Sequence, residues 1–192
     1  YNKIINHSEG KKLVNRIGEY KGIDILVLVV NFVDILGHSR SESKILQEMV
    51  PDESAYRKAI STWLENVWLM DVLKQVSSWG YTVYITSDHG STRVNKGVLV
   101  GADKETSKGV RYKIGRNLNT NEKHAMIIRR PADYRLMDLM HQTTYLIAKE
   151  DVFFLYPNQQ HKYESRLKDS FQHGGISLEE MMVPVVTMRS KS

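Results

Sequence analysis

The chain has 192 residues, of which 41% are hydrophobic and 26% charged, and its formal net charge is +5 at pH 7. These proportions are ordinary for a soluble globular protein, so a low-complexity chain is excluded. The absence of cysteine excludes disulfides and thiolate metal sites and leaves histidine and carboxylate side chains as metal ligands. No apolar stretch approaches the roughly 20 residues of a membrane span, and the N-terminus lacks signal-peptide character. We therefore expect a cytoplasmic protein without membrane insertion.

The first half of the chain predicts a strand, a helix and a second strand. Residues 24–33 form a nearly continuous apolar run, typical of a strand covered on both faces. Over residues 52–79 the apolar positions recur every three or four residues, which predicts a helix with Gly80 at its C-terminal end. Residues 81–86 predict the next strand. This order indicates a βαβ unit and an α/β fold with a mainly parallel sheet sandwiched by helices.

The second half of the chain contains shorter candidate elements. Strands are predicted over residues 125–128, 152–156 and 183–188, and a helix over residues 133–149. The segment Ser177–Glu180 is similar to a helix-starting capping box. No internal repeat or linker marks a domain boundary.

The net charge is concentrated in one segment, residues 91–123. It carries eight lysines and arginines against three acidic residues, so it alone accounts for the charge of +5. Its position directly after Asp88 and His89 favours an anionic substrate near those residues. A solvated surface loop is the alternative interpretation.

Asp34 and His38 are the first candidate metal ligands. They are four residues apart and share one face if the segment is helical, where both can reach one divalent ion. The alternative is that Asp34 caps a helix and His38 is a surface residue.

Asp88, His89 and Gly90 follow the strand predicted over residues 81–86. The carboxyl ends of parallel strands form the ligand-binding edge of such a sheet, and Asp34 and Asp88 both fall at strand ends. Gly90 permits the turn that would let Asp88 and His89 reach one ion. A polar loop is the alternative. A Ser-His-Asp hydrolase that uses Ser87 has little support, because its triad comes from separated segments and no Gly-x-Ser-x-Gly elbow is present.

His173 precedes two glycines and is a further candidate ligand. The other histidines are expected to be structural: His7, His124, His141 and His161.

The order of these motifs resembles the alkaline phosphatase superfamily. An Asp-x3-His follows the first buried strand, an Asp-His-Gly the next, and a His-Gly-Gly precedes the last strand. The segments 86–92 and 171–184 resemble the PglZ branch of that superfamily, and within it the PorX-type response regulators tied to type IX secretion. The resemblance covers residues 1–192 as the C-terminal part of one PglZ domain, truncated on its N-terminal side, with a basic loop insertion at about 91–123.

The resemblance also implies ligands and a reaction. Asp34, His38 and His173 would hold one metal ion, and Asp88 and His89 would form half of the second site. The ions would be zinc, with manganese as the other candidate. The Thr or Ser nucleophile and a further Asp are expected upstream of Tyr1, so this fragment alone is expected to be inactive.

The implied function is a two-metal phosphodiesterase or phosphatase acting on nucleotide or oligonucleotide phosphodiesters. A sensor kinase would act through a receiver domain outside this chain, and a homodimer is a further expectation. Two alternatives stay open: a signalling module that binds metal or nucleotide without turnover, and a structural protein. Substrate contacts are predicted at four residues of the basic segment: Arg93, Arg111, Tyr112 and Lys113.

Overall fold

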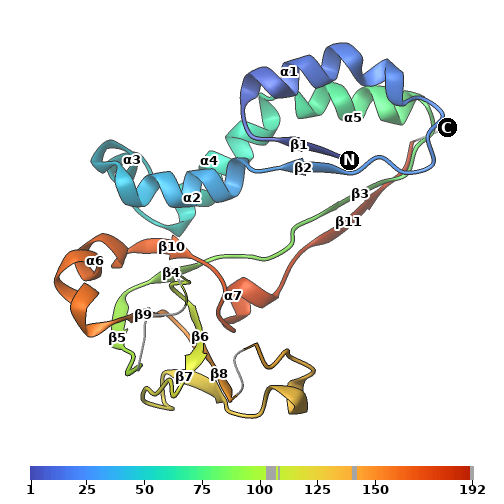
Figure 1. Ribbon diagram of the computed structural model, residues 1–192. Helices are drawn as coiled ribbons and strands as arrows, with labels where there is room; N and C mark the ends of the chain where they lie inside the picture. The colour runs from blue at the N-terminus through green and yellow to red at the C-terminus, as the bar shows by residue number, and fades with distance from the viewer. Residues whose placement is uncertain (103–106, 108, 140–141, 191–192) are drawn as a thin grey trace. The chain divides into compact units, whose positions relative to one another are not determined.

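The computed structural model describes residues 1–102, 107, 109–139 and 142–190. Its contacts divide the chain into two compact units (Figure 1). The first comprises Tyr1–Thr86 and Pro184–Ser192, and the second comprises Ser87–Val183.

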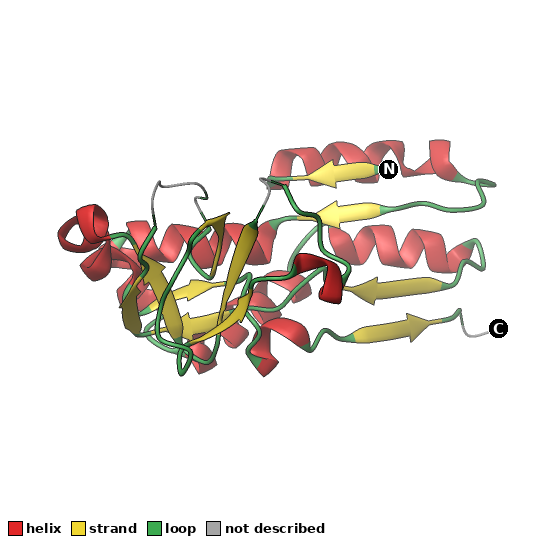
Figure 2. Ribbon diagram, turned by 60° about the horizontal axis from the view of Figure 1, so that its bottom comes forward, coloured by secondary structure: helices red, strands yellow, loops and turns green. Residues whose placement is uncertain are grey.

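The first unit combines helices with four strands that Figure 2 shows side by side. Hydrogen bonds link the strands in two pairs, β1 with β2 in parallel and β3 with β11 antiparallel. The strands are β1 (Asn2–Ile4), β2 (Leu28–Val30), β3 (Val83–Thr86) and β11 (Val185–Met188). The helices are α1 (His7–Arg16), a 3-10 turn (Ile17–Tyr20), α2 (Phe32–Glu42), α3 (Lys44–Met49), α4 (Glu53–Glu65) and α5 (Leu69–Ser78).

The core of this unit lies between its strands and the helices α1 and α5, which run along one side of them (Figure 1). Leu13 of α1 and Val72 of α5 are buried against Ile4 of β1, with Leu28 and Val30 of β2 packed beside them. Burying one such side chain contributes roughly 1.5–3 kcal/mol, so this shared apolar layer is a main source of the unit's stability.

The predicted helix over residues 52–79 is two helices, because the segment Asn66–Trp68 interrupts it between α4 and α5. Its predicted end is confirmed. Gly80 has φ +79°, its N–H donates to Ser77 O at 2.9 Å, and the Tyr81 N–H donates to Val76 O at 3.2 Å. These two bonds form the Schellman end that favours glycine at this position.

The predicted strand over residues 24–33 is much shorter than expected, since only Leu28–Val30 pair in β2. The apolar run continues into helix α2 from Phe32. Periodicity cannot separate a buried strand from the first turn of a following helix in such a run.

The second unit consists mainly of short strands. The pairs are β4 with β10, β5 with β9, and the three-stranded sheet β6-β8-β7. Their bounds are β4 (Thr92–Val94), β5 (Lys96–Leu99), β6 (Tyr112–Arg116), β7 (Ala125–Ile128), β8 (Thr143–Ala148), β9 (Val152–Leu155) and β10 (Ser170–Gln172). Helices α6 (Gln160–Leu167) and α7 (Leu178–Met181) complete it, with 3-10 turns at Pro131–Tyr134 and Pro157–Gln159.

The helix predicted over residues 133–149 is wrong. Thr143–Ala148 instead form the central strand β8, paired on both sides with β6 and β7. β-branched and aromatic residues such as Thr143, Thr144 and Tyr145 fit a paired strand, and Leu146 and Ala148 are fully buried there. Met140 and His141 lie outside the described residues.

The mixed α/β class is confirmed, whereas the mainly parallel sheet is confirmed only in part. Each sheet of the described residues has two or three strands, and only β1-β2 and β5-β9 are parallel. Among the described residues, no helix is both long and apolar enough to span a membrane.

Candidate metal-binding site

Asp34 and His38 lie one turn apart on helix α2 of the first unit. Asn31 is the N-cap of this helix, so Asp34 lies within the first turn and is not the cap. Asp34 Oδ1 and His38 Nε2 are 3.3 Å apart, and the side chains are 44% and 50% exposed. Two ligand atoms on one tetrahedral zinc, each about 2.0–2.1 Å from it, are also about 3.3 Å apart. The pair therefore fits one ion.

A buried arginine fixes the helix that carries this pair. Arg40 is 1% exposed, and its guanidinium donates to Val50 O at 2.6 Å and to Pro51 O at 3.2 Å. The Tyr56 hydroxyl of α4 donates to Val33 O at 2.9 Å. The sequence carries no signal for this role of Arg40, since nothing in a single sequence separates a buried arginine from a surface one.

Asp88 and His89 open the second unit directly after β3. The His89 backbone N–H donates to Asp88 Oδ1 at 3.1 Å, and Asp88 Oδ2 lies 3.8 Å from His89 Nε2. His89 Nδ1 lies 2.9 Å from Gly90 O. A carbonyl oxygen only accepts, so in the neutral imidazole this contact places the proton on Nδ1 and the lone pair on Nε2, where it can bind a metal ion.

His89 and His173 stack on each other within the second unit. Their ring centroids are 3.9 Å apart and their planes differ by 11°. His173 follows β10, and Gly174 after it has φ +101°, a left-handed conformation that favours glycine. The structure thus joins the Asp-His-Gly and His-Gly-Gly motifs.

A buried ion pair, Arg111 with Glu180, is hydrogen-bonded to both motifs through Gly90 and Gly175. Arg111 is fully buried, and its Nε and Nη2 donate to Glu180 Oε1 and Oε2 at 2.9 and 2.5 Å. Glu180 also accepts the N–H groups of Gly175 at 2.8 Å and Ser177 at 3.1 Å. The Ser177 bond is half of the predicted capping box.

The same contacts set the ionisation of Glu180. Burial raises the pKa of its carboxyl, but the hydrogen bonds from Arg111, Gly175 and Ser177 outweigh burial and hold the pKa below its ordinary value of 4.5. Glu180 is therefore a carboxylate at neutral pH. In the sequence, the capping-box pattern marks Glu180 only as part of a helix start, and it carries no signal for the bond to Arg111.

The four predicted substrate contacts differ in accessibility. Arg111 donates within the fold, and Lys113, 3% exposed, donates to Ser107 O and lies over the Tyr156 ring. Arg93 is partly exposed and pairs with Asp169. Substrate contact by Arg111 and Lys113 stays a prediction that would require both to become accessible. Two further lysines of the basic segment 91–123, Lys104 and Lys108, lie outside the described residues.

Among the predicted substrate contacts, Tyr112 is an exposed residue beside the loop that carries His173. It is 41% exposed, and a Cβ on Gly174 would lie 3.0 Å from its Cδ1 atom. The ring therefore flanks the loop that carries His173. This position fits the predicted stacking role.

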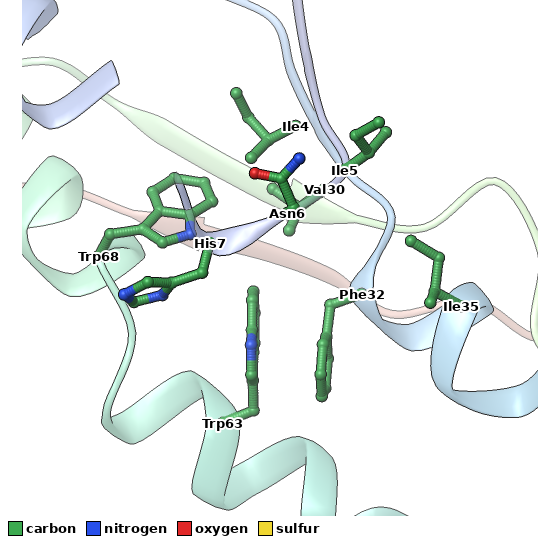
Figure 3. Close-up of a pocket in the computed structure, with 9 residues that line it drawn as sticks. All are labelled: Ile4, Ile5, Asn6, His7, Val30, Phe32, Ile35, Trp63 and Trp68. Carbon is green, nitrogen blue, oxygen red and sulfur yellow. The ribbon is translucent and has the colours of Figure 1, made fainter. Parts of the chain in front are cut away.

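An aromatic pocket of the first unit opens where β1 and β2 end (Figure 3). The rings of Phe32 and Trp63 stack with centroids 4.2 Å apart, and His7 and Trp68 lie beside them. The pocket volume of about 70 Å³ is under half that of a cavity of about 150 Å³ that binds benzene.

Comparison with known proteins gives one family. Residues 1–188 match the family described as the BREX system PglZ alkaline phosphatase-like domain. No curated protein matches the chain.

Proposed function

We propose that this chain, which belongs to the PglZ family of alkaline phosphatase-like domains, supplies metal ligands to a two-metal phosphodiesterase or phosphatase. The family indicates a phosphoesterase-type fold and hydrolase chemistry, and such folds generally use divalent metals. Phosphodiester hydrolysis and the identity of the metal are the parts that we propose.

The His89–His173 stack is the observation that carries this proposal. In the superfamily the adjacent Asp-His pair and the late His serve different ions, which here assigns His89 to one ion and His173 to the other. The ions of a two-metal site are about 3.5–4 Å apart, and the two rings are 3.9 Å apart. Two imidazoles so spaced can each serve one ion of such a pair.

The other proposed ligands follow from the same family pattern. Asp34 and His38 would hold the ion that His173 serves, and Asp88 would join His89 at the second ion. Mixed imidazole and carboxylate ligands favour zinc, with manganese as an alternative. When bound, the two ions would polarise a phosphoryl group and activate an attacking oxygen.

The chain's own residues would orient these groups. Gly90 O fixes the His89 tautomer, and Gly174 turns the chain so that His173 meets the His89 ring. We propose that the nucleophile and a further carboxylate come from outside these residues. Exposed Tyr112 and partly exposed Arg93 are the accessible candidates for stacking on a base and for binding a phosphate.

The proposed substrates are nucleotide or oligonucleotide phosphodiesters, and the proposed context is a PorX-type response regulator that receives its signal from a sensor kinase. Exposed Tyr112 beside the His173 loop supports a substrate with a base. Homodimerisation is proposed on the same resemblance.

Metal analysis of the complete protein tests the proposal. We expect close to two zinc or manganese ions per chain, at least one fewer in Asp34→Ala and His173→Ala, and loss of phosphodiester hydrolysis in both. His161→Ala, which removes an exposed imidazole of α6, is the matched control and should keep both ions. A wild-type protein without bound metal would overturn the proposal, and bound metal without hydrolysis would favour a non-catalytic binding module.

A further inference from the structure

The loops that carry His89 and His173 are both attached to Glu180. Gly90, the residue after His89, donates its N–H to Glu180 O at 2.9 Å. Gly175, two residues after His173, donates to Glu180 Oε1 at 2.8 Å. One residue therefore binds both loops, with its backbone oxygen on one side and its carboxylate on the other.

These attachments are close enough to exclude side chains. A Cβ on Gly90 would overlap Glu179 O, and a Cβ on Gly175 would lie 2.5 Å from Arg111 Nη2 and 2.7 Å from Ala148 O. Such distances are below ordinary van der Waals contact, so neither position can hold a side chain unless its surroundings shift. The backbone of both loops therefore lies close against Glu179, Glu180 and Arg111.

Arg111 holds Glu180 in this position. The Glu180 carboxylate accepts two bonds from Arg111 and one each from Gly175 and Ser177, which uses the roughly four acceptor sites of a carboxylate. Arg111 is itself fixed by bonds from Nη1 to Val152 O and Lys149 O. A bidentate arginine pair of this kind defines orientation as well as charge.

We propose that Arg111 and Glu180 are positioning residues of the metal site, which hold His89 and His173 in register for the two ions. This inference rests on the proposed function. The pair would act through the two loops without contacting the ions, as outer-shell partners of metal ligands do. The donor chemistry fits, because the His89 tautomer set by Gly90 leaves Nε2 for an ion.

A merely structural ion pair would behave differently. Its loss would lower stability but would leave the two imidazoles and their affinity for metal unchanged once the protein is folded. The test therefore needs a measurement on the imidazoles themselves and a control variant of similar instability.

The experiment compares Glu180→Gln and Arg111→Lys with Val100→Ala in the complete protein. Val100 is fully buried in the core of the same unit, so its truncation lowers stability without touching either loop. Imidazole NMR signals are recorded for the metal-free proteins, zinc and manganese affinities by calorimetry, and stability by urea unfolding.

We expect both ion-pair variants to shift the His89 and His173 signals and to weaken metal binding about 10–100-fold, while Val100→Ala shifts neither. Unchanged imidazole signals in a folded ion-pair variant would overturn the inference. If both variants unfold, the double replacement Arg111→Met with Glu180→Leu preserves an apolar core and gives the same test. Absence of metal from the wild-type protein would overturn the proposed function alone, because the NMR comparison needs no metal.

Discussion

The His89 and His173 rings are parallel to within 11°, with centroids 3.9 Å apart. The two residues come from segments that the chain separates by several strands, and each is followed by a glycine. Close by, Gly90 and Gly175 make contacts that leave no room for a Cβ. Substitutions at those contacts give the most direct tests.

Gly90→Ala should destabilise the second unit. The added Cβ would overlap Glu179 O, so α7 or the His89 loop must move, at a cost of about 1–3 kcal/mol. Urea unfolding followed by circular dichroism measures the loss. Gly18→Ala is the matched control, since a Cβ there meets nothing within 4 Å, and equal stabilities of the two variants would contradict the prediction.

Acid should weaken the wild-type protein more than Glu180→Gln. The folded-state pKa of Glu180 lies below 4.5, so its ionised form stabilises the protein above about pH 4.5. That contribution is lost as the pH falls from 4.5 through the folded-state pKa. The difference in unfolding free energy between wild type and variant should therefore shrink between pH 5 and pH 2. A difference that stays constant over this range would show that Glu180 does not titrate with folding.

Arg40→Ala should loosen helix α2. Its loss leaves Val50 O and Pro51 O without their guanidinium donor, which costs about 1–3 kcal/mol for each oxygen that stays buried. Hydrogen exchange of the α2 amides measures the effect, and we expect faster exchange around His38. Arg16→Ala, which removes a surface pair with Glu19, should leave α2 exchange unchanged.

Gly10→Ala should disturb the aromatic pocket. A Cβ on Gly10 would overlap the Trp68 indole, which is 4% exposed and lines the pocket. The displaced indole should lower stability by about 1–3 kcal/mol and shift tryptophan fluorescence. Gly18→Ala is again the control and should leave both properties unchanged. If Gly10→Ala also left fluorescence and stability unchanged, the prediction would be contradicted, because Trp68 would then have room to move.

Elements marked by local chemistry could be predicted from the sequence. The glycine end of α5 and the strand β7 lie where expected, because turn residues and apolar runs specify them locally. The helix predicted over residues 133–149 failed since pairing of β8 with two neighbouring strands outweighs its helix-like spacing. Tertiary pairing of this kind is invisible to periodicity.

The candidate ligands could be predicted from the sequence, but the residues that hold the ligand-bearing segments in place could not. Asp34 and His38 share a helix face, as their spacing predicts. Arg111 shows the limit: its place in a basic segment indicated a phosphate contact, and the structure gives it Glu180 as a partner. A charged residue shows its partner only when distant segments have folded together.

The buried arginines have a consequence for the proposed metal site. Arg40 steadies the helix of Asp34 and His38, and Arg111 steadies the loops of His89 and His173, in each case through bonds that need no ion. If the proposed ions bind these preorganised groups, binding should cost little conformational entropy, and a chelator should remove the ions without unfolding the protein, unlike a zinc finger. The metal-free protein would then stay folded and could take up ions again.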